Sequence, residues 1–385
     1  MSMTDLTRTK LHRVRDEFQV CRRLTYLDVA GRAPMADRVH RELTDHLTVC
    51  LTEGARKEEW LARVEAIRQR TASFIGAGTD EIAFMKNTSD GLNTIGAALD
   101  LRAGDNVIVC PEFEHVNNLY PWLHLRDRGI DTRTVPLRGA MVDPRDVAEH
   151  MDERTRVVAV STVSSWTGAR PDLPAIAKLC RDRDVFLLAD AAQSLGIVDT
   201  DVRELGVDGL ASATQKGLLG MYGLGILYCR REWLPRLRPP FLSVSSVARA
   251  GLHESDLGSL AGYRLHETAA RFETGNPNFA GLFALDAALS LLEEVGADAV
   301  ESRVTTLTAQ LIRGLRDRGV PVVTPDQPGT HAGIVAFEVP DINETDQRLR
   351  DNDIRLSVRR GRLRASLHVY NDESDLDRLL YLVGS

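Results

Sequence analysis

The fold of this chain is most clearly indicated by residues 185–193, Val-Phe-Leu-Leu-Ala-Asp-Ala-Ala-Gln. An apolar strand, Val185–Ala189, runs directly into Asp190, and Gln193 follows three residues later. A strand without alternating polar positions is typical of a parallel sheet that is covered on both faces. Ligands bind at the carboxyl ends of the strands in such sheets, so Asp190 is expected to face a ligand. A cap on the following helix is the simpler alternative for this aspartate.

Six further short apolar runs repeat this pattern, and amphipathic segments separate several of them. The expected strands are 81–85, 106–110, 132–135, 157–160, 209–212 and 225–229, and the expected helices between them are 90–101, 118–128, 173–183 and 202–205. This alternation predicts an α/β fold with a mostly parallel sheet. Helix-spaced apolar positions precede it in residues 36–74. An irregular stretch (233–263), a helix (278–295) and a smaller α+β region with strands near 333–338 and 364–368 follow it.

The composition of the 385 residues excludes several classes of protein. The chain is 43% hydrophobic and 27% charged, and its formal net charge of −7 argues against a general nucleic-acid binder. Its five cysteines show no C-x-x-C spacing, so neither a disulfide framework nor a metal site is indicated. Because the sequence contains no membrane-length apolar run and no signal-peptide pattern, a cytoplasmic location is expected.

Lysine chemistry has few candidates, because lysine occurs only at positions 10, 57, 86, 178 and 216. Lys216 follows small and hydroxyl residues and enters a turn that contains Gly220, Gly223 and Gly225. This environment suits covalent or phosphate chemistry, although the glycines equally suit a tight turn.

Two more polar segments follow expected strands. Residues 87–91, Asn-Thr-Ser-Asp-Gly, open an apolar helix, where hydroxyls and free backbone N–H groups can bind an anion or simply cap the helix. Glu114 and His115 follow the strand 106–110, which places His115 at the same edge of the sheet as Asp190.

In this order and spacing, the motifs resemble the class V branch of the fold-type I pyridoxal 5'-phosphate (PLP) enzymes, nearest the cysteine desulfurase and selenocysteine lyase group. The resemblance covers nearly the whole chain. It rests on Tyr26-Leu27-Asp28, residues 88–93, Glu114-His115 through Pro121-Trp122, Asp190 through Gln193, Gln215-Lys216, residues 272–278, Arg364 through Leu367, and Tyr370-Asn371. With it, we expect an N-terminal segment (1–20), a large PLP-binding α/β domain (21–260) and a small C-terminal α+β domain (261–385).

The resemblance also implies a role for each site residue. Lys216 would bind PLP covalently and move the α-proton of the substrate, Asp190 would pair with the pyridine nitrogen, and His115 would stack on the ring. The other implied contacts are Gln193 to the phenolic oxygen, Thr88, Ser89 and Thr214 to the phosphate, Asn276 to the phosphate of the second subunit in a homodimer, and Arg364 to the substrate carboxylate.

Several positions depart from the family pattern. Ser165 replaces an asparagine that commonly helps to bind the substrate carboxylate, and Arg32 either contacts an additional group of the substrate or is solvated. Arg359 is also expected to contact the substrate. Related desulfurases carry a reactive cysteine in the segment that corresponds to residues 359–364, where this chain has none. Cys110, near His115, is expected to be buried and inert, so persulfide transfer is not expected.

Together these features predict a PLP-dependent enzyme that acts on an amino-acid substrate through a Cα carbanion. The first expectation is a C–S β-lyase that acts on a cysteine conjugate, because the resemblance links the ring-stacking histidine to the desulfurase and lyase branch. An aminotransferase, epimerase or decarboxylase in small-molecule biosynthesis is the alternative. A non-catalytic regulator with this fold is a third reading, weakened by the presence of lysine, aspartate, histidine and arginine together.

Overall fold

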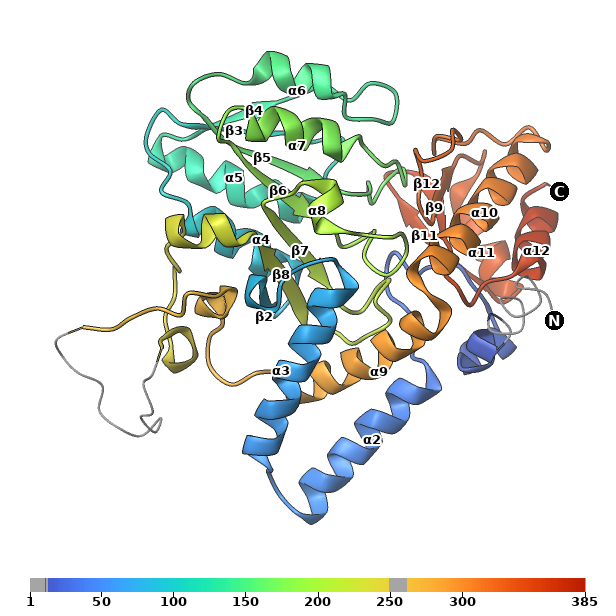
Figure 1. The fold of residues 1–385 in the computed structure, drawn as a ribbon. Coiled ribbons are helices and arrows are strands. Elements are labelled where there is room, and N and C mark those ends of the chain that lie inside the picture. Colours follow the sequence, from blue (N-terminus) through green and yellow to red (C-terminus); the bar gives the residue numbers. More distant parts are fainter. Residues whose placement is uncertain (1–10, 12, 249–261, 385) are drawn as a thin grey trace.

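The computed structural model describes residues 11, 13–248 and 262–384, which form a large α/β part and a smaller α+β part (Figure 1). A seven-stranded sheet lies at the centre of the large part, in the strand order β2-β8-β7-β6-β5-β3-β4. The strands are β2 Ile82–Met85, β3 Asn106–Val109, β4 Asp131–Thr134, β5 Thr155–Ser161, β6 Phe186–Asp190, β7 Gly209–Ala213 and β8 Gly225–Cys229. Strands β3 to β7 are parallel to one another, whereas β8 is antiparallel to both β7 and β2. The expected α/β class with a mostly parallel sheet is confirmed.

Both faces of this sheet are covered, which explains its uninterrupted apolar strands. Phe186 and Leu188 of β6 are buried in one hydrophobic core, and Leu187 and Ala189 are buried in the other. Successive side chains of a strand point to opposite faces, so a strand between two cores needs apolar residues at every position. The helices of this part are α2 Asp37–Thr52, α3 Lys57–Phe74, α4 Thr88–Ala98, α5 Tyr120–His124, α6 Pro144–His150, α7 Leu173–Arg181 and α8 Val202–Leu205.

The prediction of one continuous helix in the region before β4 is wrong. Residues 118–128 were expected to form one helix, but the structure divides this region into a 3-10 turn (Val116–Asn118), the short α5 and a second 3-10 turn (Leu125–Arg128). Pro121 lies in the first turn of α5, where the missing N–H of a proline is tolerated. Gly129 then ends the region in the left-handed conformation. Apolar spacing alone does not reveal such changes of helix type.

The smaller part is built on an antiparallel sheet in the order β11-β12-β9. Its strands are β9 Ile334–Phe337, β11 Ser357–Arg359 and β12 Arg362–Ser366, and its helices are α10 Ala297–Arg316, α11 Ile342–Asp351 and α12 Glu373–Val383. The 20-residue α10, which the sequence analysis did not single out, follows the expected helix α9 Phe279–Val295 after one glycine.

Contacts cross the expected domain boundary at 260/261. Strand β1 (Thr25–Tyr26) pairs in parallel with β10 (Ile354–Arg355), so residues 25–26 of the expected large domain lie on the smaller part. Helix α9 lies beside α2 and α3 (Figure 1), where Asp286 of α9 binds Arg63 and Arg70 of α3. The boundaries at 20/21 and 260/261 therefore stay predictions.

Part of the irregular stretch 233–263 lies outside the described residues. In the described portion, the helical turns are the 3-10 turns Arg231–Arg236 and Val244–Ser246, and Val247 forms an isolated bridge with Leu265. Among the helices of the described ranges, none is both long and apolar enough to cross a membrane.

Candidate active site

Strands β6 and β7 bring Asp190 and Lys216 to one edge of the sheet. Asp190 is the last residue of β6 and pairs in register with Ala211 of β7, and Lys216 lies three residues beyond the end of β7. Oδ1 of Asp190 accepts a hydrogen bond from the Ala192 N–H at 2.9 Å. Burial raises the pKa of Asp190, whereas the positive charge of Lys216 opposes this rise. The carboxylate and the lysine are thus coupled at a buried sheet edge.

The surroundings of Lys216 favour its neutral amine. Burial is the largest cause of its lowered pKa, and the positive charges of Arg364 and Arg359 lower the pKa further. The negative charges of Asp190 and Asp28 act in the opposite direction. A lysine whose pKa is lowered in this way is a better nucleophile and base than a solvated lysine.

His115 lies within electrostatic range of the same lysine. Burial lowers the pKa of His115, and the charges of Lys216, Arg364, Arg359 and Arg360 lower it further. Nδ1 of the imidazole accepts a hydrogen bond from the Asn117 N–H at 3.2 Å. The ring is therefore neutral near pH 7, and its proton is on Nε2.

Arg364 forms a buried cationic group on the smaller part. It is 3% exposed on β12; its Nε donates to Ser357 Oγ at 3.1 Å and its Nη1 donates to the Ser165 carbonyl at 2.8 Å. Its Nη2 lies 3.5 Å from Asp28 Oδ1. Burial lowers the pKa of Arg364 to about 10, so it stays charged at neutral pH. Ser165 Oγ is buried without a partner in the described part of the chain.

The remaining substrate and ring contacts expected from the sequence lie around this centre. Gln193 lines a small cavity together with Lys216, and its amide donates to the Ala30 carbonyl at 3.2 Å. Arg359 is exposed but close enough for its charge to act on Lys216, His115 and Arg364. Arg32 is exposed, and its guanidinium lies 5.8 Å from the centroid of the Tyr222 ring. Their contacts with a substrate stay predictions.

The expected phosphate site is the N-terminus of α4. Thr88 and Ser89 are its first two residues, and the Asn87 side chain caps it by accepting from the Asp90 N–H at 2.9 Å. Gly225 permits a close approach of β8, because a Cβ there would lie 2.7 Å from the Asn87 backbone. Thr214 is buried, and its hydroxyl donates to the Met221 carbonyl at 2.7 Å. Its direct role at the phosphate therefore stays a prediction.

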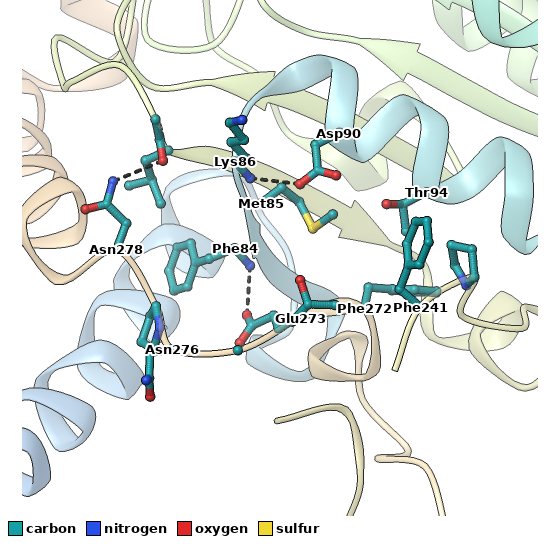
Figure 2. A pocket seen from close by; sticks show the side chains of 16 residues that line it. Phe84, Met85, Lys86, Asp90, Thr94, Phe241, Phe272, Glu273, Asn276 and Asn278 are labelled. Carbon is teal, nitrogen blue, oxygen red and sulfur yellow. Dashed lines mark hydrogen bonds between the residues drawn. The ribbon is translucent and has the colours of Figure 1, made fainter. Parts of the chain in front are cut away.

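Asn276 lies on a different cavity from Lys216 within this chain. Residues 272–278 line a cavity of about 210 Å³ together with Lys86 and Asp90 at the beginning of α4 (Figure 2). The segment is attached to β2 because Glu273 accepts from the Phe84 N–H at 2.8 Å. The Asn276 amide is exposed and points away from Lys86 and Asp90 in Figure 2. Within one chain, Asn276 therefore lies on a cavity that is separate from the cavity lined by Lys216 and Gln193.

Two further residues lie beside His115, and neither was expected at the site. Glu114 is a fully buried carboxylic acid, and Trp166 stacks on the His115 ring. An acid beside a histidine at the end of an apolar strand is a signal that could have identified Glu114. The contact with Trp166 joins residues about 50 positions apart, and no local pattern predicts it.

The arrangement fits the PLP expected from the resemblance. A buried acid and a half-buried lysine follow neighbouring strands, and a helix N-terminus lies at the same edge of the sheet. Ser165 Oγ and Gln215 Oε1 are buried without partners among the described residues, as expected where a polar ligand completes the hydrogen bonding. Asp190, Lys216 and the beginning of α4 would hold the pyridine nitrogen, the carbonyl carbon and the phosphate of the cofactor.

Comparisons with known proteins agree with this geometry. The family model for aminotransferase class-V matches residues 25–379. A probable cysteine desulfurase of Methanothermobacter thermautotrophicus is 31% identical, over 95% of this chain and 95% of the relative. The apo structure of a cysteine desulfurase from Thermococcus onnurineus NA1 has a TM-score of 0.87 at 27% identity, covering 96% of each chain.

A second structural likeness shows the fold alone. The cystine C-S lyase C-DES, solved in complex with its reaction product cysteine persulfide, has a TM-score of 0.87 at 23% identity, over 96% of this chain and 99% of that chain. The family match extends over almost the whole sequence, and the residues at the sheet edge fit the cofactor of that family. The chain therefore belongs to the aminotransferase class-V family of PLP-dependent enzymes.

Proposed function

We propose that this enzyme is a C–S β-lyase that cleaves a cysteine conjugate without a nucleophilic protein cysteine. The β11–β12 hairpin is the observation that carries the proposal. Arg359 pairs with Arg362, so only Arg360 and Gly361 connect the strands. Both have positive φ, 47° and 73°, as in the tightest hairpin turns. This two-residue turn leaves no room for the cysteine-bearing loop that the resemblance leads us to expect in a desulfurase.

Four of the five cysteines are also poor candidates for a nucleophile. Cys110, nearest to His115 in sequence, is buried, and burial raises its pKa to about 12. Burial raises the pKa of Cys21 and Cys180 to about 12 as well, and it also raises that of Cys229. Cys50 is exposed on α2. Because the thiolate is the reactive form, the four thiols with raised pKa values are poor nucleophiles.

The other residues then have separate tasks. PLP, when bound, supplies an electron sink that stabilises negative charge at the substrate Cα. Arg364 binds the α-carboxylate through the N–H groups that Ser357 and Ser165 leave free, and Asp190 holds a proton on the pyridine nitrogen. The Lys216 amine takes the α-proton at Nζ. His115, neutral, donates a hydrogen bond from Nε2 to the departing sulfur. A thiol has a pKa near 8.5, so its thiolate leaves without a strong acid.

The products follow from the bonds that break. Loss of the α-proton and of the thiolate from Cβ converts the conjugate into a thiol and an unsaturated amino acid, and water then converts the latter into pyruvate and ammonium. One molecule each of conjugate and water therefore yields one each of thiol, pyruvate and ammonium. No oxidant or reductant is required.

Product analysis tests the proposal. The PLP-loaded enzyme is incubated with L-cystine and a panel of S-alkyl and S-aryl L-cysteines, with the Lys216→Ala variant as the control. We expect thiol (or persulfide from cystine), pyruvate and ammonium in equal amounts. Accumulation of the amine form of the cofactor without ammonium would contradict the proposal in favour of an aminotransferase. Carbon dioxide or loss of optical purity would select the decarboxylase or epimerase.

We further propose that the enzyme is a homodimer in which Asn276 reaches the phosphate of the second subunit. The exposed position of Asn276, on a cavity separate from Lys216, supports this arrangement. Sedimentation equilibrium should give twice the chain mass, and a monomer that binds PLP with full activity would contradict it. The cytoplasmic location stays a prediction.

A further inference from the structure

Trp166 contacts three groups beside the proposed cofactor position. Its indole ring is stacked with the His115 imidazole, with 5.9 Å between the centroids and 9° between the planes. Its Nε1–H donates to the Glu114 carbonyl at 2.6 Å. The Arg360 guanidinium, at the tip of the β11–β12 hairpin, lies 3.9 Å from the centroid of the indole ring. Trp166 therefore links the hairpin to the histidine.

Glu114 fixes the backbone on which His115 lies. Its side chain is completely buried. Oε1 accepts from the Ser161 N–H at 2.6 Å, and Oε2 accepts from Ser161 Oγ at 2.5 Å and from the Asn118 amide at 2.8 Å. These contacts attach the residue before His115 to the end of β5 and to the turn that follows the histidine. The peptide is thus held by strong contacts, and the ring orientation depends on what touches the ring itself.

The contacts of Arg360 hold it over the indole. Its Nη1 donates to the Glu112 carbonyl at 2.9 Å, so the guanidinium is attached to the segment that carries Glu114 and His115. Stacking of a guanidinium on an indole is favourable even at an exposed position. Its positive charge also disfavours protonation of His115.

We propose that Trp166, covered by Arg360, is a positioning residue that keeps the His115 ring parallel to the indole and in its neutral form with the proton on Nε2. The inference rests on the proposed function, in which Nε2–H of His115 contacts the departing sulfur. A tilted or protonated imidazole would lose this contact. The β11–β12 hairpin then has a second effect, because it supplies the arginine that covers the indole.

The chain contains a matched pair that serves as a control. Arg236 lies 3.7 Å from the centroid of the Trp233 ring, almost the same geometry as Arg360 on Trp166. Trp233 packs against Phe186, in the hydrophobic core that also contains Leu188. It contacts no histidine ring in the described part of the chain. Trp233→Phe and Arg236→Gln therefore reproduce the loss of an indole N–H and of a stacked guanidinium away from the site.

The test measures the tautomer and the pKa of His115 by ¹⁵N NMR in the apo-protein, together with the visible circular dichroism of the protein after PLP is added. Trp166→Ala should raise the pKa of His115 by about half a unit or more, because water replaces the indole, and should change the dichroism band. Trp166→Phe, which keeps an aromatic ring, should restore most of both signals. Arg360→Gln should raise the pKa by a few tenths of a unit, and the two control variants should change neither signal.

The proposal is overturned if Trp166→Ala or Arg360→Gln lowers the melting temperature but leaves the tautomer, the pKa and the dichroism band unchanged. If Trp166→Ala does not fold, Trp166→Phe and the exposed Arg360→Gln decide in the same way. The NMR signals do not depend on turnover. If the variants show the expected changes at His115 but the enzyme releases no thiol, the proposed lyase function is wrong and the positioning role of Trp166 still holds.

Discussion

The edge of the parallel sheet and the β11–β12 hairpin bring opposite kinds of residue to one site. The sheet edge contributes Asp190 and Lys216, whose pKa values are shifted mainly by burial. The hairpin contributes two exposed arginines, Arg359 and Arg360, and the buried Arg364. Burial makes the first pair reactive, whereas the second region supplies fixed positive charge that binds and orients. We therefore expect changes at the sheet edge to affect the chemical step and a change of Arg364 to affect binding.

The largest effect should come from Lys216→Ala. This change removes the amine that binds the cofactor and moves the α-proton, so turnover should fall by about 10⁴-fold or more. The visible absorption of the lysine-bound cofactor should also disappear. Lys178→Ala is the control, because Lys178 is exposed on α7 and pairs with Asp182. A borohydride-reducible PLP adduct retained by Lys216→Ala would place the cofactor on another lysine.

Asp190→Asn should be next in size. A neutral amide cannot hold the proton on the pyridine nitrogen, and loss of a charged contact in a buried site costs about 3–5 kcal/mol, or roughly two to four decades in rate. The fold and the binding of PLP should persist, as measured by circular dichroism and by cofactor content. Near-normal turnover of this variant would end the distinction between a reactive sheet edge and a binding hairpin.

Arg364→Lys should instead change binding. Lysine cannot reproduce the forked contacts to Ser357 and Ser165 together with a substrate carboxylate. One charged hydrogen bond corresponds to about 1.5–3 kcal/mol, so KM should rise by roughly 10- to 100-fold, with a smaller change in kcat. Arg362→Lys, two residues earlier on β12 and paired with Glu338, is the matched control and should have little effect. A fall in kcat with unchanged KM would contradict the comparison.

The last effect concerns the stability of the fold at a residue packed behind Lys216, and it leaves turnover unchanged near neutral pH. His368 is completely buried; its Nε2 bonds to the Gly217 carbonyl at 2.8 Å, and burial lowers its pKa to about 4. The unfolded chain binds a proton near pH 6.5, whereas the folded chain does so only near pH 4, so this group's contribution to stability is lost as the pH falls through that range. The loss should reach about 3 kcal/mol.

Urea unfolding of the wild type and His368→Gln measures this effect. The stability of the wild type relative to the variant should decrease as the pH is lowered from about 6.5 to about 4 and stay constant above that range. A difference that does not change with pH would show that His368 titrates normally in the folded protein.

The same two regions differ in how far the sequence could predict them. Strand β6 was predictable because each of its residues enters one of two cores, which produces a continuous apolar run. Asp190 and Lys216 follow strands in such a pattern, so their place at the sheet edge was also accessible. The antiparallel direction of β8 was not, because the pairing of a strand depends on its neighbours and an apolar run does not specify it.

The turn and the side-chain contacts around the β11–β12 hairpin could not be predicted from the sequence. Residues 359–364 showed only a run of arginines, whereas the two-residue turn depends on the pairing of Arg359 with Arg362. The contacts of Trp166 with His115 and Arg360, and of Arg364 with the Ser165 carbonyl, join distant parts of the chain. Such tertiary contacts arise from packing and leave no local periodicity.

The central claim is that C–S cleavage here needs no protein thiol. The most direct test is the rate of thiol release from a cysteine conjugate by five single variants, in which each cysteine is changed to alanine. We predict rates within about threefold of the wild type, measured at a temperature where the variants with altered buried cysteines stay folded. A Cys→Ala variant that keeps its bound PLP spectrum but loses thiol release by several decades would contradict the account and restore the desulfurase mechanism.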